Sequence, residues 1–167
     1  MKPSNGGEEK IISKNLKNGL KPVWRATCTF HPNGETLVYS YIREKILFSM
    51  NLNTGKVSKL TNSNVKYTYP IFSKDGSKIA VNKSNSDNKG YDLVVINPDG
   101  TGAKVISKNV ISYSPGAWSY SGSELVFSGM VNGSQQLFKI NIATQNEIML
   151  TNKPNFNVKQ TWCLCFL

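Results

Sequence analysis

Few side chains in this sequence are of the types that catalyse reactions or bind metals. The chain has 167 residues, a single histidine, His31, and three cysteines, Cys28, Cys163 and Cys165. A closed zinc site needs four Cys or His ligands, usually in two spaced pairs, and this chain offers one Cys-x-Cys pair. Three thiols do not make the even-numbered set of a disulfide framework. We therefore expect reduced cysteines, no metal site, and a solvated turn residue rather than a general base at His31.

The acidic residues do not indicate catalysis either. Asp75 and Asp99 stand in Asp-Gly turns, where Asp is favoured because its side chain bonds to the nearby backbone. Residues 85–90 imitate the start of an EF-hand loop, but Lys89 takes the fifth position and Ile96 the twelfth, where a bidentate Glu is needed. The sequence contains no Gly-x-Ser-x-Gly elbow, P-loop or dinucleotide fingerprint. It predicts no catalytic or metal-binding residue, no enzyme activity and no cofactor.

The elements that carry these residues are set by a segment that occurs three times. The copies at residues 30–40, 72–82 and 118–128 each begin with an aromatic residue, reach a Gly four residues on, and continue as an alternating apolar run. The starting aromatics are 42 and then 46 residues apart. Self-similarity at this period is typical of propellers and solenoids.

Each copy is predicted to form four short strands. In the third copy one strand ends at Trp118, and the others span about 123–128, 136–141 and 145–150, without a helical period. Four strands per repeat of this length make one propeller blade. We predict an all-β fold, a β-propeller fragment of about three four-stranded antiparallel blades plus an unpaired strand at each end. The predicted segments are a disordered leader at 1–9, blades at about 22–62, 66–108 and 112–152, and the start of a fourth blade at 157–167.

The recurring aromatic residues have a structural explanation. Alternating apolar residues give each blade two faces that must be covered, so blades have to stack on their neighbours. Phe30, Phe72, Trp118 and Trp162 occupy the same repeat position. We expect them to pack between blades rather than to stack on a ligand.

The repeat resembles the WD40-like repeats of TolB-type six-bladed propellers. The second copy carries the resemblance best, in Tyr69-Pro-Ile-Phe-Ser-Lys-Asp-Gly and Tyr91-Asp-Leu-Val-Val-Ile-Asn-Pro-Asp-Gly, and the similarity covers residues 10–162. It implies a non-enzymatic protein-binding scaffold, as in TolB. The alternative that it implies is the non-catalytic propeller portion of a larger prolyl-oligopeptidase-like hydrolase or sugar-acid lyase. Six blades at this period would need about 260 residues, more than this chain has.

Charge is the second functional signal. The net charge is +10, and residues 1–83 carry 14 Lys/Arg against 5 Asp/Glu, whereas residues 84–167 carry 6 against 5. Loops between the second and third strands of a blade, and crossovers between blades, emerge on one side of a propeller, which we call the loop face. Lysines collect there and predict a protein partner with an acidic surface. The alternative is a solubilising lysine surface. Nucleic acid is disfavoured because Arg is rare and no RNA-binding signature occurs.

The predicted partner-binding residues are lysines and aromatics of the loop face. They are Lys14, Lys17, Lys21, Lys66, Tyr67, Tyr69, Lys89, Lys108, Tyr113, Lys153, Phe156 and Lys159. For the four aromatics, packing in the core or channel is the alternative explanation.

Two further expectations concern the chain as a whole. No apolar run approaches the roughly 20 residues of a membrane helix, and the N-terminus lacks the apolar core of a secretory signal. The sequence as written predicts a cytoplasmic protein, or a periplasmic or secreted one if the native start is missing. An arc of three blades would expose a blade face and strand edges at each end, so we expect self-association there.

Overall fold

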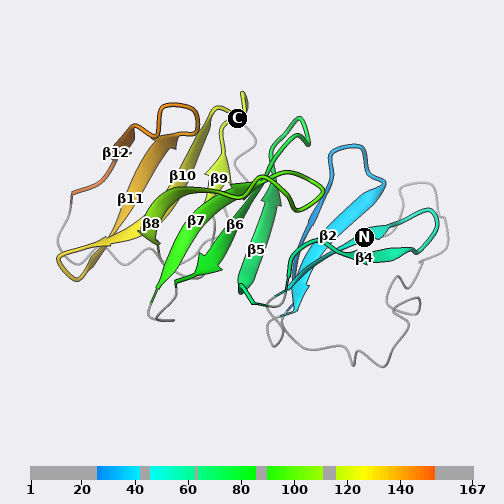
Figure 1. Cartoon of the computed structure of the whole chain (residues 1–167). Helices are drawn as coiled ribbons and strands as arrows, with labels where there is room; N and C mark the ends of the chain where they lie inside the picture. The colour runs from blue at the N-terminus through cyan, green and yellow to red at the C-terminus, as the bar shows by residue number, and fades with distance from the viewer. Residues whose placement is uncertain (1–25, 42–45, 63, 86–89, 111–115, 153–167) are drawn as a thin grey trace, which may run out of the picture.

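A computed structural model of the chain describes residues 26–41, 46–62, 64–85, 90–110 and 116–152. These residues form strands and turns, without a helix among them (Figure 1). Blade 1 contains β1 (Ala26–Phe30), β2 (Thr36–Tyr41), β3 (Leu47–Asn51) and β4 (Val57–Lys59). Blade 2 contains β5 (Tyr67–Phe72), β6 (Ile79–Ser84), β7 (Tyr91–Ile96) and β8 (Lys104–Val110). Blade 3 contains β9 (Ala117–Trp118), β10 (Glu124–Val131), β11 (Ser134–Asn141) and β12 (Glu147–Met149).

All neighbouring strands pair antiparallel, which confirms the predicted all-β propeller fragment. The three blades stand side by side in chain order (Figure 1). Blade 1 is a separate four-stranded sheet, but blades 2 and 3 are joined, because Val110 at the end of β8 pairs with Gly129 of β10. β9 is only two residues long and pairs with β10 at Leu125 and Val126 alone. It therefore leaves Gly129 of β10 able to pair with Val110.

The recurring glycines close the turns between the first and second strands of each blade. Gly34, Gly76 and Gly122 have positive φ angles of 74°, 74° and 70°. Each donates its N–H to the carbonyl oxygen three residues earlier, at 2.9, 2.9 and 3.0 Å. A left-handed backbone at this point favours Gly, since other side chains are strained there. This requirement explains why the repeat keeps a Gly four residues after its aromatic.

The second hairpin of blade 3 is longer than predicted. β10 continues to Val131 and β11 begins at Ser134, so Asn132 and Gly133 alone connect them. Both connecting residues have positive φ, 49° and 77°. Asn-Gly is the favoured pair for such a two-residue turn, because the turn then matches the twist of the strands.

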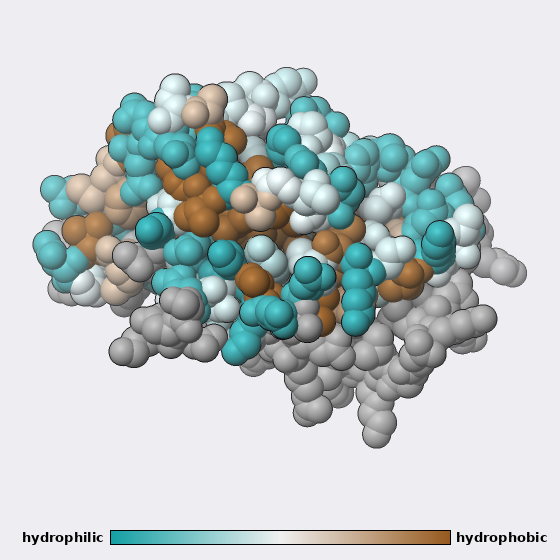
Figure 2. All heavy atoms as spheres, in the orientation of Figure 1, coloured by the Kyte–Doolittle hydropathy of each residue, from teal (hydrophilic) through white to brown (hydrophobic). Residues whose placement is uncertain are grey.

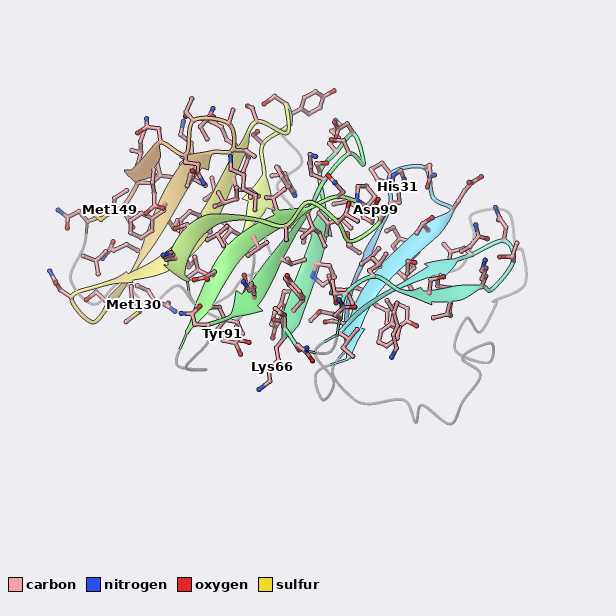
Figure 3. The ribbon with its side chains drawn as sticks, in the orientation of Figure 1. His31, Lys66, Tyr91, Asp99, Met130 and Met149 are labelled. Carbon is pink, nitrogen blue, oxygen red and sulfur yellow. The ribbon has the colours of Figure 1, made fainter. Side chains whose placement is uncertain are left out.

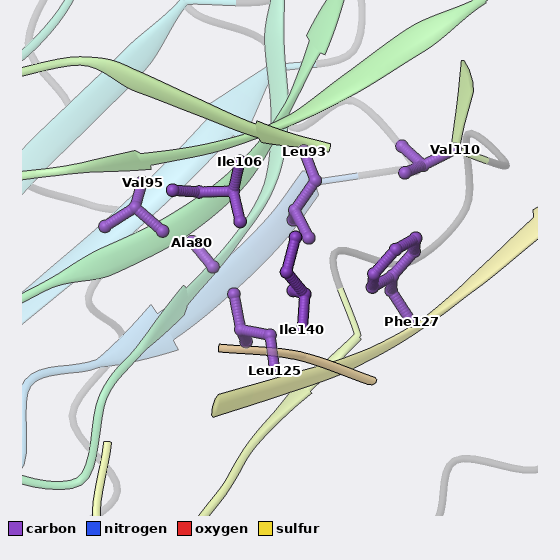
Figure 4. Close-up of a cluster of buried hydrophobic side chains, with 8 residues drawn as sticks. All are labelled: Ala80, Leu93, Val95, Ile106, Val110, Leu125, Phe127 and Ile140. Carbon is purple, nitrogen blue, oxygen red and sulfur yellow. The ribbon is translucent and has the colours of Figure 1, made fainter. Parts of the chain in front are cut away.

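The core lies between the blades, because successive side chains of a strand point to opposite faces of the blade and pack against the blades on either side. In β6, Ile79 and Val81 pack with Val38 of blade 1, whereas Ala80 packs with Leu125 of blade 3. Figure 4 shows this second cluster, in which strands of blades 2 and 3 bring their buried side chains together. Each of these blades is therefore stabilised mainly by its neighbour, as in other repeat proteins.

Candidate interaction surfaces

The turns and the loops of the blades emerge on opposite sides. His31, in the β1–β2 turn, and Asp99, in the β7–β8 turn, lie at one end of the strands, and Lys66 projects from the other (Figure 3). Lys66 precedes β5 and Lys108 lies near the end of β8, and both are exposed. Lys83 of β6, between them in the sequence, is partly buried. Among the described residues, exposed lysines thus lie just before the first strand of blade 2 and within its last strand.

Many predicted partner-binding residues lie outside the described residues. These are Lys14, Lys17, Lys21, Lys89, Tyr113, Lys153, Phe156 and Lys159. Four of the predicted set remain to be compared with the structure, namely Lys66, Tyr67, Tyr69 and Lys108.

Tyr67 corrects one of those predictions. Its side chain is only 8% exposed and packs in the cluster between blades 1 and 2 with Val38 and Val81. Burial raises the pKa of its hydroxyl above the usual value, because the ionised form is poorly solvated there. The physical reason is alternation, which turns the first side chain of β5 toward blade 1. Tyr67 is a core residue rather than an accessible contact.

Tyr69 is held in place by a β-bulge. The pairing of β5 with β6 shifts between Thr68 and Ile71, and Tyr69 has a φ of 55°. Its backbone N–H donates to Oγ1 of Thr27 in blade 1 at 3.0 Å. The side chain is partly exposed beside the loop face. A positive φ at a bulky residue is unusual and persists only where the surroundings fix it, as this hydrogen bond between blades does here.

The aromatics at the strand ends follow the predicted packing at two of the three described positions. Trp118 packs against the cluster between blades 2 and 3, and its indole N–H donates to the carbonyl oxygen of Ile71 in blade 2 at 3.2 Å. Phe72 packs against the cluster shared with blade 1. Phe30 differs, since it is 56% exposed, and the prediction of buried packing is wrong for this position. Phe72 and Trp118 each pack against the preceding blade, whereas the described residues place no strand before blade 1 and therefore none against Phe30. Trp162 lies outside the described residues.

The environment of His31 differs from the predicted one, that of a solvated turn residue. Its ring lies edge-on to Phe72 of the next blade, with 4.9 Å between ring centroids. A Cβ at Gly76 would lie 2.4 Å from its Nε2, so the ring fills the space that this glycine leaves. Nδ1 accepts the backbone N–H of Asn33 at 3.1 Å. His31 is thus partly buried packing between the turns of blades 1 and 2.

The two Asp-Gly turns behave as their residue types predict. Asp75 accepts hydrogen bonds from the Ser73 hydroxyl at 2.6 Å and from the Ser77 N–H at 3.1 Å. These bonds, the one from Ser73 first, lower the pKa of Asp75 to about 2. Asp99 accepts from the hydroxyl and the N–H of Thr101, which likewise lowers its pKa. Each carboxylate is engaged in its own turn, and among the described residues no cluster of His, Cys, Asp or Glu could hold a metal ion.

The two ends of the arc differ in how much apolar side chain they expose. On blade 3, Met130, Ile148 and Leu150 are 50%, 46% and 50% exposed. On blade 1, Phe48 and Met50 face away from blade 2 and are only 6% and 2% exposed. Exposed blade faces at both ends were expected, and the apolar centre of the blade 1 face does not fit that expectation. In Figure 2, hydrophobic side chains reach the surface among the strands of blades 2 and 3, interrupted by hydrophilic ones.

The fold identifies a partial β-propeller, made of three of the four-stranded blades that such proteins repeat around a ring. Similar solved structures include a TolB-like protein from Agrobacterium tumefaciens, 19% identical with a TM-score of 0.66, matched over 75% of this chain and 45% of that one. TolB from Acinetobacter baumannii is 16% identical with a TM-score of 0.64, matched over 74% of this chain and 31% of that one. The propeller domain of the trilobed protease from Pyrococcus furiosus is 21% identical with a TM-score of 0.56, over 78% and 42%.

The sequence comparisons are sparser. No protein-family model matches the chain. An uncharacterized protein of Agrobacterium fabrum is 29% identical over 86 residues, which are 50% of this chain and 27% of that protein. The chain therefore spans less than half the length of these relatives. Within the described residues, no helix has the length and apolar character to cross a membrane.

Proposed function

We propose that this chain is part of a non-enzymatic protein-binding scaffold that uses its loop face to bind an acidic partner. The observation that carries the proposal is the placement of exposed Lys66 just before β5 and of exposed Lys108 near the end of β8, in a chain of net charge +10. Opposite charges accelerate association and select partners, whereas exposed lysines contribute little to folding. The TolB-like folds among the similar structures support a scaffold role.

Charge reversal on the loop face tests this proposal. Changing Lys66, Lys108 and Lys153 together to Glu is expected to slow association about tenfold or more and to flatten its salt dependence, because the steering charge is removed. The measurement is the rate of binding to a partner recovered with the wild-type chain, at several salt concentrations.

The matched control changes Lys56, Lys59 and Lys104 to Glu, which alters net charge equally. These three side chains are exposed and belong to the β3–β4 turn, β4 and the start of β8, away from the loop face. Binding that is equally slow in both triple variants would indicate a net-charge effect and contradict the proposed site. Thermal unfolding of both variants checks that the fold is kept.

A second candidate is the propeller portion of a larger hydrolase or lyase. It is favoured by the similarity to the propeller domain of a protease. In that case a hydrolase domain would be encoded in the same reading frame, and the loop face would contact that domain. The flanking coding sequence distinguishes the two candidates.

We also propose that blade 3 mediates self-association. Leu125 and Phe127 face blade 2, so the alternate residues Val126 and Met130 face away from it, and Ile148 joins this side by pairing with Lys139. Among the described strands β12 lies at the edge of its sheet, and its three side chains are all exposed. Exposed apolar groups beside an unpaired strand edge are a template for association.

The variant Met130→Lys with Ile148→Lys is expected to lower the average mass toward that of a monomer in sedimentation analysis at micromolar concentration, with the cysteines kept reduced. The added charges would have to be desolvated at the contact. The control is Tyr120→Lys, an exposed aromatic in the β9–β10 turn of the same blade. A monomeric wild-type chain, or a variant with unchanged mass, would show the proposal to be wrong.

A further inference from the structure

Two polar pairs occupy equivalent positions in blades 1 and 2. Thr27 of β1 lies directly across from Ser40 of β2, and Thr68 of β5 lies directly across from Asn82 of β6. Ser40 and Asn82 are 42 residues apart, the same interval that separates Gly34 from Gly76. Side chains of directly opposed residues lie on the same face of a sheet. The two pairs are therefore the same site of two successive repeats.

The pair in blade 1 is satisfied within the protein. The hydroxyl oxygens of Thr27 and Ser40 are 2.7 Å apart, which is one hydrogen bond. Oγ1 of Thr27 also accepts the backbone N–H of Tyr69 in blade 2 at 3.0 Å. Ser40 is fully buried, so these bonds replace the water that its hydroxyl loses on folding.

The pair in blade 2 is equally buried but lacks such partners among the described residues. Asn82 is 0% and Thr68 4% exposed. Within the part of the chain that the structure describes, Oδ1 and Nδ2 of Asn82 and Oγ1 of Thr68 have no hydrogen-bond partner. Ala80 lies two residues from Asn82 on the same strand face and Leu93 pairs with it, and both belong to the apolar cluster between blades 2 and 3. Buried polar atoms in native proteins are nearly always hydrogen-bonded, to protein or to ordered water.

The sequence explains why the hydrogen bonds of the blade 1 pair are not repeated in blade 2. The residue equivalent to Tyr69 in the third copy, 46 positions on, is Pro115. Proline has no backbone N–H in any conformation, so it cannot supply the bond that Tyr69 supplies. The larger amide of Asn82 also has one more polar atom to satisfy than the hydroxyl of Ser40.

We propose that Thr68 and Asn82 form a buried water site between blades 2 and 3. The three atoms offer what an ordered water requires, since Oδ1 accepts, Nδ2 donates, and the Thr68 hydroxyl does both. Buried waters typically make about three hydrogen bonds to groups of this kind and are retained as part of the fold. In blade 2 the water takes the place that protein groups hold in blade 1.

The test counts long-lived internal waters by oxygen-17 magnetic relaxation dispersion on the whole chain. The wild type is expected to show a dispersion that loses at least one water's amplitude in Asn82→Leu and in Thr68→Val, which remove the polar atoms at nearly constant volume. Thr68→Ser keeps the hydroxyl and should keep the amplitude. Ser40→Ala is the matched control, because Ser40 is the repeat equivalent of Asn82 and its hydroxyl is bonded within the protein, so the amplitude should not change.

Thermal unfolding gives an independent readout. If water occupies the site, Thr68→Val lowers the melting temperature, because it leaves Asn82 and the water with fewer partners. If the site is dry, the same change removes an unsatisfied hydroxyl and raises the melting temperature. An unchanged dispersion in both Asn82→Leu and Thr68→Val, or a raised melting temperature in Thr68→Val, would overturn the proposal.

Discussion

Trp118→Ala is expected to lower the free energy of unfolding by about 3 kcal/mol, because it opens a cavity in the packing between blades 2 and 3. The indole contributes both apolar contact with the cluster that contains Leu125 and a hydrogen bond to the Ile71 carbonyl. Truncation removes the contact and leaves that carbonyl without its donor. Urea unfolding at a fixed protein concentration, followed by circular dichroism, measures the loss.

The repeat supplies a matched control for this substitution. Phe30 holds the same repeat position in blade 1 but is 56% exposed, so Phe30→Ala is expected to cost less than about 1 kcal/mol. The two variants remove comparable aromatic groups and differ in the presence of a preceding blade. Equal losses in both variants would mean that Trp118 is not packing between blades as described.

Gly100→Ala is expected to cause a loss of comparable size, for a backbone reason. Gly100 lies in the β7–β8 turn with a φ of 87°, and a Cβ there would be 1.9 Å from the carbonyl oxygen of Leu60 in blade 1. Neither atom belongs to a flexible side chain that could move aside. The turn has to shift away from blade 1, and we expect a loss of more than about 3 kcal/mol in the free energy of unfolding.

Gly34→Ala separates the two contributions to that loss. Gly34 also has a positive φ, 74°, but a Cβ there would meet nothing within 4 Å. Its substitution therefore reports backbone strain alone, about 1 kcal/mol. The additional loss in Gly100→Ala measures the close approach of blade 2 to blade 1. If the two alanine variants were equally stable, blade 2 would not approach Leu60 of blade 1 as closely at Gly100 as described.

Much of the fold could be predicted from the repeat, because each recurring residue has a local physical cause. Gly34, Gly76 and Gly122 adopt the left-handed backbone that closes their turns, and the apolar alternation places the strands. The end of β10 was predicted too early, although Asn132-Gly133 is a hairpin signal that defines it. The joining of blades 2 and 3 was not predictable, since it depends on how short β9 is.

The candidate surface was less predictable, because sequence places a residue on a strand but does not say what covers it. Tyr67 follows exposed Lys66 and was predicted to be accessible, yet alternation turns it into the core. Phe30 and Trp118 share one repeat position but differ in burial, since only Trp118 has a described blade before it. Asn82 is a polar side chain in the alternating run of β6, and it was the one indication in the sequence of the proposed water site between blades 2 and 3.

Because Val110 pairs with Gly129, the contact between blades 2 and 3 differs from the contact between blades 1 and 2. Blades 2 and 3 share one sheet, so separating them requires breaking a main-chain bridge as well as packing. Blade 1 meets blade 2 through side-chain packing and through threonine hydroxyls, those of Thr27 and Thr29, that accept backbone N–H groups. The two contacts thus differ in kind, because substitutions of Thr27 and Thr29 would remove the hydrogen bonds between blades 1 and 2, whereas the Val110–Gly129 bridge is made by the main chain and depends on no side-chain hydroxyl.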